Sequence, residues 1–125
     1  MKKVELLGKE LSNLYAIAKQ VIHYFEENET SFPSKKVQNI IIQYVKFCEA
    51  NKEQVSNILM NLEVNPGNTT DSIVEEITEN LQSIAVQKGS STEVRQLGFT
   101  MSLNRLISYH RANLENLDAW NHMVV

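Results

Sequence analysis

The chain contains 125 residues, of which 42% are hydrophobic and 22% are charged, and its formal net charge is -3. This composition suits a single folded domain over residues 1–125 and excludes a disordered chain. Because lysines and arginines are scattered through a mildly acidic chain, no basic surface is predicted, and we expect no nucleic-acid binding.

The only cysteine, Cys48, excludes an internal disulfide and a zinc site made of paired cysteines. One unpaired cysteine also favours a reducing, cytoplasmic setting. Charged residues interrupt the stretch after Lys2 and Lys3, so no signal peptide is predicted. No apolar run approaches the roughly 20 residues of a membrane-spanning helix, so we expect no membrane insertion.

Residues 3–27 carry apolar side chains at spacings of three and four, which predicts the first helix. Its stripe consists of Val4, Leu7, Leu11, Leu14, Ala18, Val21 and Phe25. Ser34 is the expected N-cap of a second helix over residues 34–62. The second stripe contains Val37, Ile41, Tyr44 or Val45, Cys48, Val55, Ile58 or Leu59, and Leu62. Asn51 and Lys52 interrupt it where apolar residues are due.

An Asn-Pro-Gly-Asn turn at residues 65–68 separates the second helix from a third over residues 71–88. Ser72 with Glu75, and Ser90 with Glu93, form capping-box patterns that predict the starts of the third and fourth helices. The third has an apolar face of Ile73, Val74, Ile77, Leu81, Ile84 and Ala85. The fourth spans residues 91–121, with Val94, Leu97, Met101, Leu103, Leu106, Ile107, His110, Leu114 and Leu117 at helical spacing.

Four amphipathic helices joined by short loops bury their stripes best as an antiparallel four-helix bundle, so the predicted fold class is all-α. The third helix is the short one, and part of the bundle would therefore stay uncovered. A homodimer formed through exposed helix faces would cover it.

Helical bundles often hold two metal ions, using one Glu from each of two helices and a Glu-x-x-His motif from each of the others. No Glu-x-x-His motif occurs in this chain. His23 with Glu26 is interpreted as a solvated surface pair, and Cys48 as a small buried hydrophobe. His110 is expected to be a hydrogen-bonded core or boundary histidine rather than a ligand. Around Trp120, a docking tail and a frayed terminus both remain open.

Three segments together resemble the YciE/YciF-type bacterial ferritin-like family. Residues 14–20 read LYAIAKQ, close to the L-Y-x-A-E-K-Q signature of that family's first helix. Residues 49–55, EANKEQV, are similar to its second-helix E-x-x-H-x-Q-I/L stretch, and residues 95–110 look like its fourth-helix segment ending in E-H-Y-E. The resemblance implies a ferritin-like bundle, often dimeric, that is linked to bacterial stress responses and has an unsettled activity.

The resemblance also implies a di-metal site, but the matching positions depart from it. Ala18 stands where the first-helix Glu is expected, and Lys52 replaces the second-helix His. Glu49 is retained, and Glu79 is matched to the third-helix acid. On the fourth helix the matching residues are Ile107, Ser108, Tyr109 and His110, of which only the tyrosine is kept. We therefore assign no catalytic, cofactor-binding or metal-binding residue.

These departures favour a metal-free, non-enzymatic bundle with a structural or interaction role and no cofactor. The alternative is an iron or manganese protein, with oxidase or iron-handling activity at a rearranged site around Glu49, Glu79 and His110. A third possibility is a small-molecule binding bundle with an apolar pocket near Ala18 and Ile107. One hypothesis gives Lys52 a role: its ammonium fills the emptied site and pairs with Glu49 or Glu79, whereas otherwise it extends to solvent at the bundle edge.

Overall fold

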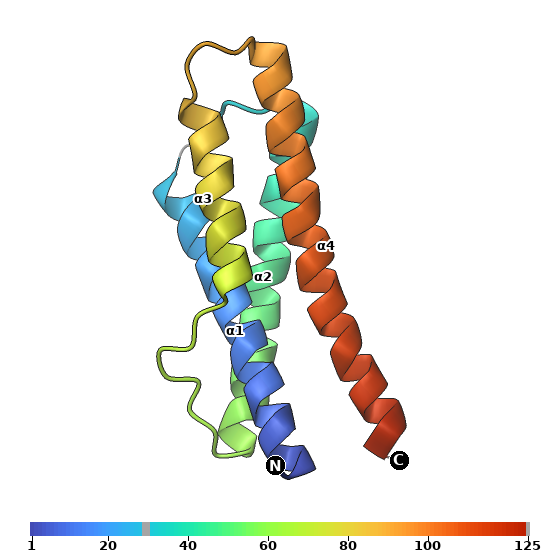
Figure 1. Cartoon of the computed structure of the whole chain (residues 1–125). Coiled ribbons are helices and arrows are strands. Elements are labelled where there is room, and N and C mark those ends of the chain that lie inside the picture. Colours follow the sequence, from blue (N-terminus) through green and yellow to red (C-terminus); the bar gives the residue numbers. More distant parts are fainter. Residues whose placement is uncertain (29–30, 125) are drawn as a thin grey trace.

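The computed structural model describes residues 1–28 and 31–124, and of residues 120–124 it describes only the helical backbone. The predictions for the region around Trp120 therefore lie outside the described side chains. Four helices follow one another, α1 (Lys3–Glu27), α2 (Lys35–Asn61), α3 (Ser72–Val86) and α4 (Thr92–Val124). Consecutive helices run in opposite directions (Figure 1). The predicted all-α four-helix fold and its short third helix are confirmed.

Local capping fixes where the helices begin. Ser34 is the N-cap of α2, as predicted, and its hydroxyl accepts a hydrogen bond from the Val37 amide at 3.4 Å. The predicted caps of the other two helices are each one residue off. Asp71 rather than Ser72 caps α3, and Ser91 rather than Ser90 accepts from the Val94 amide at 3.2 Å. Adjacent Asp, Ser and Thr residues are all good caps, so the sequence pattern alone did not separate them.

The end of α2 is set by a left-handed residue ahead of the Asn-Pro-Gly-Asn turn. Glu63 has φ 57°, and its amide donates to the Met60 carbonyl at 3.0 Å. The Val64 amide donates to the Leu59 carbonyl at 2.9 Å. This pair of bonds is a Schellman motif, which satisfies the last carbonyls of the helix.

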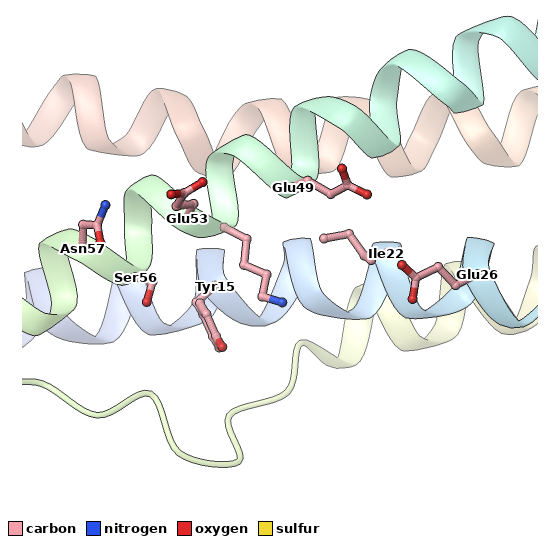
Figure 2. Close-up of a pocket in the computed structure, with 8 residues that line it drawn as sticks. Tyr15, Ile22, Glu26, Glu49, Glu53, Ser56 and Asn57 are labelled. Carbon is pink, nitrogen blue, oxygen red and sulfur yellow. The ribbon is translucent and has the colours of Figure 1, made fainter.

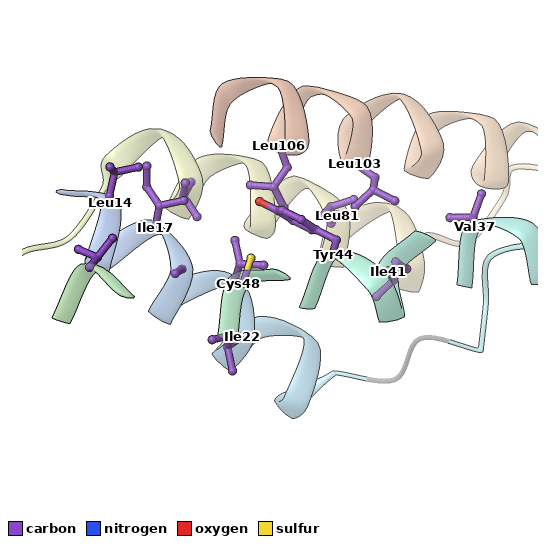
Figure 3. Packing of buried hydrophobic residues seen from close by; sticks show 14 of the residues in the cluster. Leu14, Ile17, Ile22, Val37, Ile41, Tyr44, Cys48, Leu81, Leu103 and Leu106 are labelled. Atoms are coloured by element: carbon purple, nitrogen blue, oxygen red, sulfur yellow. The ribbon is translucent and has the colours of Figure 1, made fainter. Parts of the chain in front are cut away.

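The core lies along α1. α2 packs mainly on α1, α4 packs mainly on α3, and α1 also contacts both α3 and α4. Ile17, Ala18 and Val21 of α1 have no exposed surface. The α2 stripe left two choices open, Tyr44 or Val45 and Ile58 or Leu59. Tyr44 and Leu59 are buried, whereas Val45 is half-buried and Ile58 is exposed. Figure 3 shows Tyr44 among Cys48, Leu81, Leu103 and Leu106.

The first half of α4 is rotated relative to its predicted stripe. Val94, Leu97 and Met101 were expected at the core but are 59%, 58% and 55% exposed. Phe99 and Ser102, which the predicted stripe did not include, are buried, and Leu103 is buried as predicted. α4 therefore carries apolar residues on two faces, and packing against α3 selects which face is buried.

The lower part of the bundle is open. α3 is only 15 residues long, whereas α4 has 33 residues and leaves the other helices towards its C-terminal end (Figure 1). Within residues 1–28 and 31–124, none of the helices combines the length and the hydropathy needed to cross a lipid bilayer.

Candidate functional site

Two of the residues matched to metal ligands lie in a groove between α1 and α2. Glu49 and Lys52 line this groove, which has a volume of about 360 Å³, together with Tyr15, Ile22 and Glu26. Figure 2 shows Glu49 extending from α2 at one end, with Ile22 and Glu26 on the adjoining turns of α1. Glu49 itself is exposed, so it belongs to the edge of the bundle rather than to its centre.

The other matched residues lie elsewhere. Glu79 is exposed and lines a groove between α3 and α4 with Arg105, whereas His110 lines a groove between α2 and α4. Ala18 is wholly buried in the apolar core. Glu49, Glu79 and His110 therefore face three different grooves and do not come together. Among the described residues, no three His, Cys, Asp or Glu side chains are grouped so as to hold a metal ion.

The hypothesis that Lys52 fills a central site and pairs with Glu49 or Glu79 is wrong about the central site and about Glu79, whereas Glu49 and Lys52 do line the same groove. Lys52 is half-buried in the groove between α1 and α2, while Glu79 lines the groove between α3 and α4. Asn51 takes the buried position of the stripe, with 7% exposure, and its Oδ1 has no hydrogen-bond partner among the residues that the structure describes. Successive residues of a helix point about 100° apart. The two polar residues that interrupt the α2 stripe therefore lie in different places, with the Asn51 amide in the core and Lys52 at the edge of the bundle.

A buried tyrosine–histidine pair joins α2 to α4. The hydroxyl of Tyr44 lies 2.8 Å from Nδ1 of His110, and the two rings meet edge to face with centroids 5.7 Å apart. His110 is 1% exposed, which confirms the expectation of a hydrogen-bonded core histidine. The sulfur of Cys48 is 4.0 Å from the same nitrogen. Cys48 is fully buried, as its place in the stripe predicted.

Burial keeps the three groups of this cluster uncharged at neutral pH. It lowers the pKa of His110 to about 4, a shift that the negative charge of Asp71 partly opposes. Burial also raises the pKa of Tyr44 and raises the pKa of Cys48 to about 12. A thiol held in its protonated form is a poor nucleophile, so Cys48 has a packing role.

The protons of the pair can be assigned from their chemistry. A phenol is a stronger acid than a neutral imidazole, and an imidazole nitrogen is a better acceptor than a phenol oxygen. We therefore assign Tyr44 as donor to Nδ1 of His110, which leaves the imidazole proton on Nε2. Nε2 is buried and has no hydrogen-bond partner among the described residues. A buried donor without a partner costs about 1–3 kcal/mol unless something satisfies it.

The groove that His110 lines, called here the α2–α4 groove, has a volume of about 320 Å³. Its apolar lining residues are Ile40, Phe47, Ile107 and Leu114. The polar lining residues are Tyr44, His110 and Arg111. Phe47 lies edge-on to the imidazole, with centroids 5.7 Å apart, and is itself 46% exposed. A half-exposed aromatic ring thus covers the buried histidine.

A second polar cluster anchors the start of α3. The Gln20 side chain accepts from the Asp71 amide at 2.7 Å and donates to the Asp71 carbonyl at 3.0 Å. One carboxylate oxygen of Asp71 accepts from the Val74 amide at 2.8 Å, and the other accepts from the Tyr109 hydroxyl at 2.6 Å. With 4% exposure, Asp71 connects α1, α3 and α4.

The sequence indicated no special role for Gln20 or Asp71, and it marked Asn51 only as a polar interruption of the second stripe. For Asp71 the only local signal was the Asp-Ser pair at residues 71–72, which marks a helix start without indicating long-range partners. The third of the sequence hypotheses placed an apolar pocket near Ala18 and Ile107. Ile107 lines the α2–α4 groove, but Ala18 does not.

Comparison of the chain with known protein families, with curated proteins and with solved structures found no match.

Proposed function

We propose that this chain is a metal-free bundle of the ferritin-like, YciE/YciF-type kind, with a structural or interaction role rather than a catalytic one. The observation that carries the proposal is the dispersal of the matched ligand positions over three grooves, with Glu49 and Glu79 exposed and Ala18 packed in the core. Two bridged metal ions need acids from several helices within a few ångströms of one another. A bacterial and stress-related setting is part of the proposal and follows from the sequence resemblance alone, whereas the cytoplasmic setting follows from the single unpaired cysteine.

The competing function, iron or manganese chemistry around Glu49, Glu79 and His110, lacks a converging set of ligands. The low pKa of His110 would leave its nitrogen free to bind a metal, but the groups that contact its ring are Tyr44, Cys48 and Phe47. The Asp71 carboxylate, whose charge acts on His110, accepts from the Val74 amide and the Tyr109 hydroxyl. The test is metal analysis of protein purified without chelator and then incubated with ferrous and manganous salts. We expect well under one bound ion per chain after desalting, and a stoichiometric pair of ions would refute the metal-free assignment.

Association is the second part of this proposal, with a second copy of the chain as the partner. The accessible surface is 8158 Å², about 1,350 Å² more than the roughly 6,800 Å² expected for a compact monomer of 14.3 kDa. A standard interface covers about 800 Å² on each partner. The excess is larger than that area, and α4 exposes Val94, Leu97 and Met101.

We assign the interface to an apolar stripe on α4 made of Val94, Leu97 and Met101. These exposed residues lie on consecutive helical turns. If two copies cross antiparallel about a two-fold axis near Leu97, that residue meets Leu97 of the second copy, and Val94 meets Met101 of the second copy. The stripe is therefore complementary to itself, which favours a closed dimer.

Light scattering after size-exclusion chromatography tests the dimer. The wild-type protein should have twice the 14.3 kDa mass of one chain. The double variant Val94→Thr and Leu97→Gln should be monomeric and still helical, because both side chains are exposed. Met60→Gln is the matched control, since Met60 is 64% exposed on α2, away from the stripe. A monomeric wild type, or a double variant that stays dimeric, would exclude this interface.

A further inference from the structure

We propose that the α2–α4 groove is a binding site for a fatty acid, with the acyl chain along its apolar walls and the carboxylate at Arg111 and His110. This site overlaps the stripe of Val94, Leu97 and Met101 only at Met101, which lies at the end away from Arg111. The carboxylate end of the site therefore does not depend on dimer formation. It gives the bundle a ligand of defined chemistry, one negative charge on a long apolar chain.

The walls of the groove suit an apolar chain. Ile40 and Phe47 are 39% and 46% exposed on α2, opposite Ile107 and Leu114 on α4, and water therefore faces apolar surface on both sides. The volume of about 320 Å³ falls within the range of small-molecule sites, which commonly lie between the helices of bundles. Transfer of an alkyl chain into such a groove is favourable for each methylene group that leaves water.

The groove continues along α4. A second cavity of about 310 Å³ shares Ile40 and Ile107 with the first and extends to Met101 and Asn104. Between Met101 and Arg111, α4 rises about 15 Å. The two cavities together form a furrow along one helix, which matches an extended chain better than a compact or planar ligand.

The polar end of the furrow selects a carboxylate. Arg111 is the one charged residue among the described residues that line the two cavities. The neighbouring residue, His110, holds a buried Nε2 donor that has no partner in the described part of the chain. An anionic headgroup would accept from the guanidinium and, once the half-exposed Phe47 ring swings aside, from Nε2. A single cation beside apolar walls favours one negative charge over a zwitterion or a polyanion.

Isothermal titration of the full chain with dodecanoate, below its micelle concentration, tests this site. Dodecyltrimethylammonium, which has the same chain and the opposite charge, is the parallel probe. We expect one dodecanoate per chain and binding of the cation at least about tenfold weaker. Arg111→Gln should weaken dodecanoate binding about tenfold through loss of a charge-assisted hydrogen bond.

Arg105→Gln is the matched control, because Arg105 is the exposed arginine of α4 that lines the groove between α3 and α4. It should bind dodecanoate as the wild type does, and so should the monomeric double variant of the α4 stripe. Equal binding of the two probes, no binding of dodecanoate, or an unchanged affinity in Arg111→Gln would overturn the assignment. None of these results would alter the metal content or the mass of the protein, so the proposed function is tested separately.

Discussion

Removal of one hydroxyl group should loosen the attachment of α3 to α4. Tyr109→Phe deletes the donor that lies 2.6 Å from the Asp71 carboxylate and leaves the ring in place. Hydrogen bonds to charged groups contribute about 1.5–3 kcal/mol. Tyr109 is only half-buried, so water can replace part of this interaction. We therefore expect the free energy of unfolding to fall by about 1–2 kcal/mol.

Urea unfolding followed by circular dichroism at 222 nm measures the change. The control is Tyr24→Phe, which also removes a hydroxyl from a half-buried ring. Among the described residues, the hydrogen bonds to Tyr24 from outside the regular helix go to its backbone carbonyl and not to its hydroxyl. Its loss should change the free energy of unfolding by less than about 0.5 kcal/mol.

A double-mutant cycle decides whether the cost belongs to the Asp71–Tyr109 bond. Asp71→Ser keeps a good N-cap for the Val74 amide, but its shorter side chain does not reach Tyr109. In that background Tyr109→Phe should be close to neutral, which corresponds to a coupling energy of about 1 kcal/mol or more. The reasoning fails if Tyr109→Phe costs the same in both backgrounds or nothing in either.

Two further substitutions follow from the core and from the packing of α4. Because burial lowers the pKa of His110 from 6.5 to about 4, the unfolded chain takes up this proton first as the pH falls. The stability held by the neutral imidazole is therefore intact above pH 6.5 and is lost towards pH 4, by about 3 kcal/mol in all. His110→Gln should flatten this pH dependence of the free energy of unfolding in urea titrations. Gly98→Ala should raise the free energy of unfolding by about 0.5–1 kcal/mol, since its new Cβ would lie at an ordinary 3.7 Å from Ile84; a lower melting temperature would contradict it.

Helix positions could be predicted because their signals are local. Residues 3–27 were predicted to be helical and α1 spans Lys3–Glu27, while the other boundaries shifted by one to three residues. The spacing of apolar residues and the capping side chains lie within a few positions of the helix that they specify. The same locality explains why Ser34 was identified as a cap, and why neighbouring caps such as Asp71 and Ser72 were not resolved.

The site depended on contacts between residues far apart in the chain. Tyr44 and His110 are 66 positions apart, and Gln20 and Asp71 are 51 apart, so no sequence spacing relates them. By itself, the sequence determined a four-helix chain without a Glu-x-x-His motif. Only the tertiary structure decided which face of each helix is buried, because this depends on how α1 to α4 rotate and pack against one another. That rotation placed Asn51 inside the bundle and separated Glu49, Glu79 and His110 into different grooves.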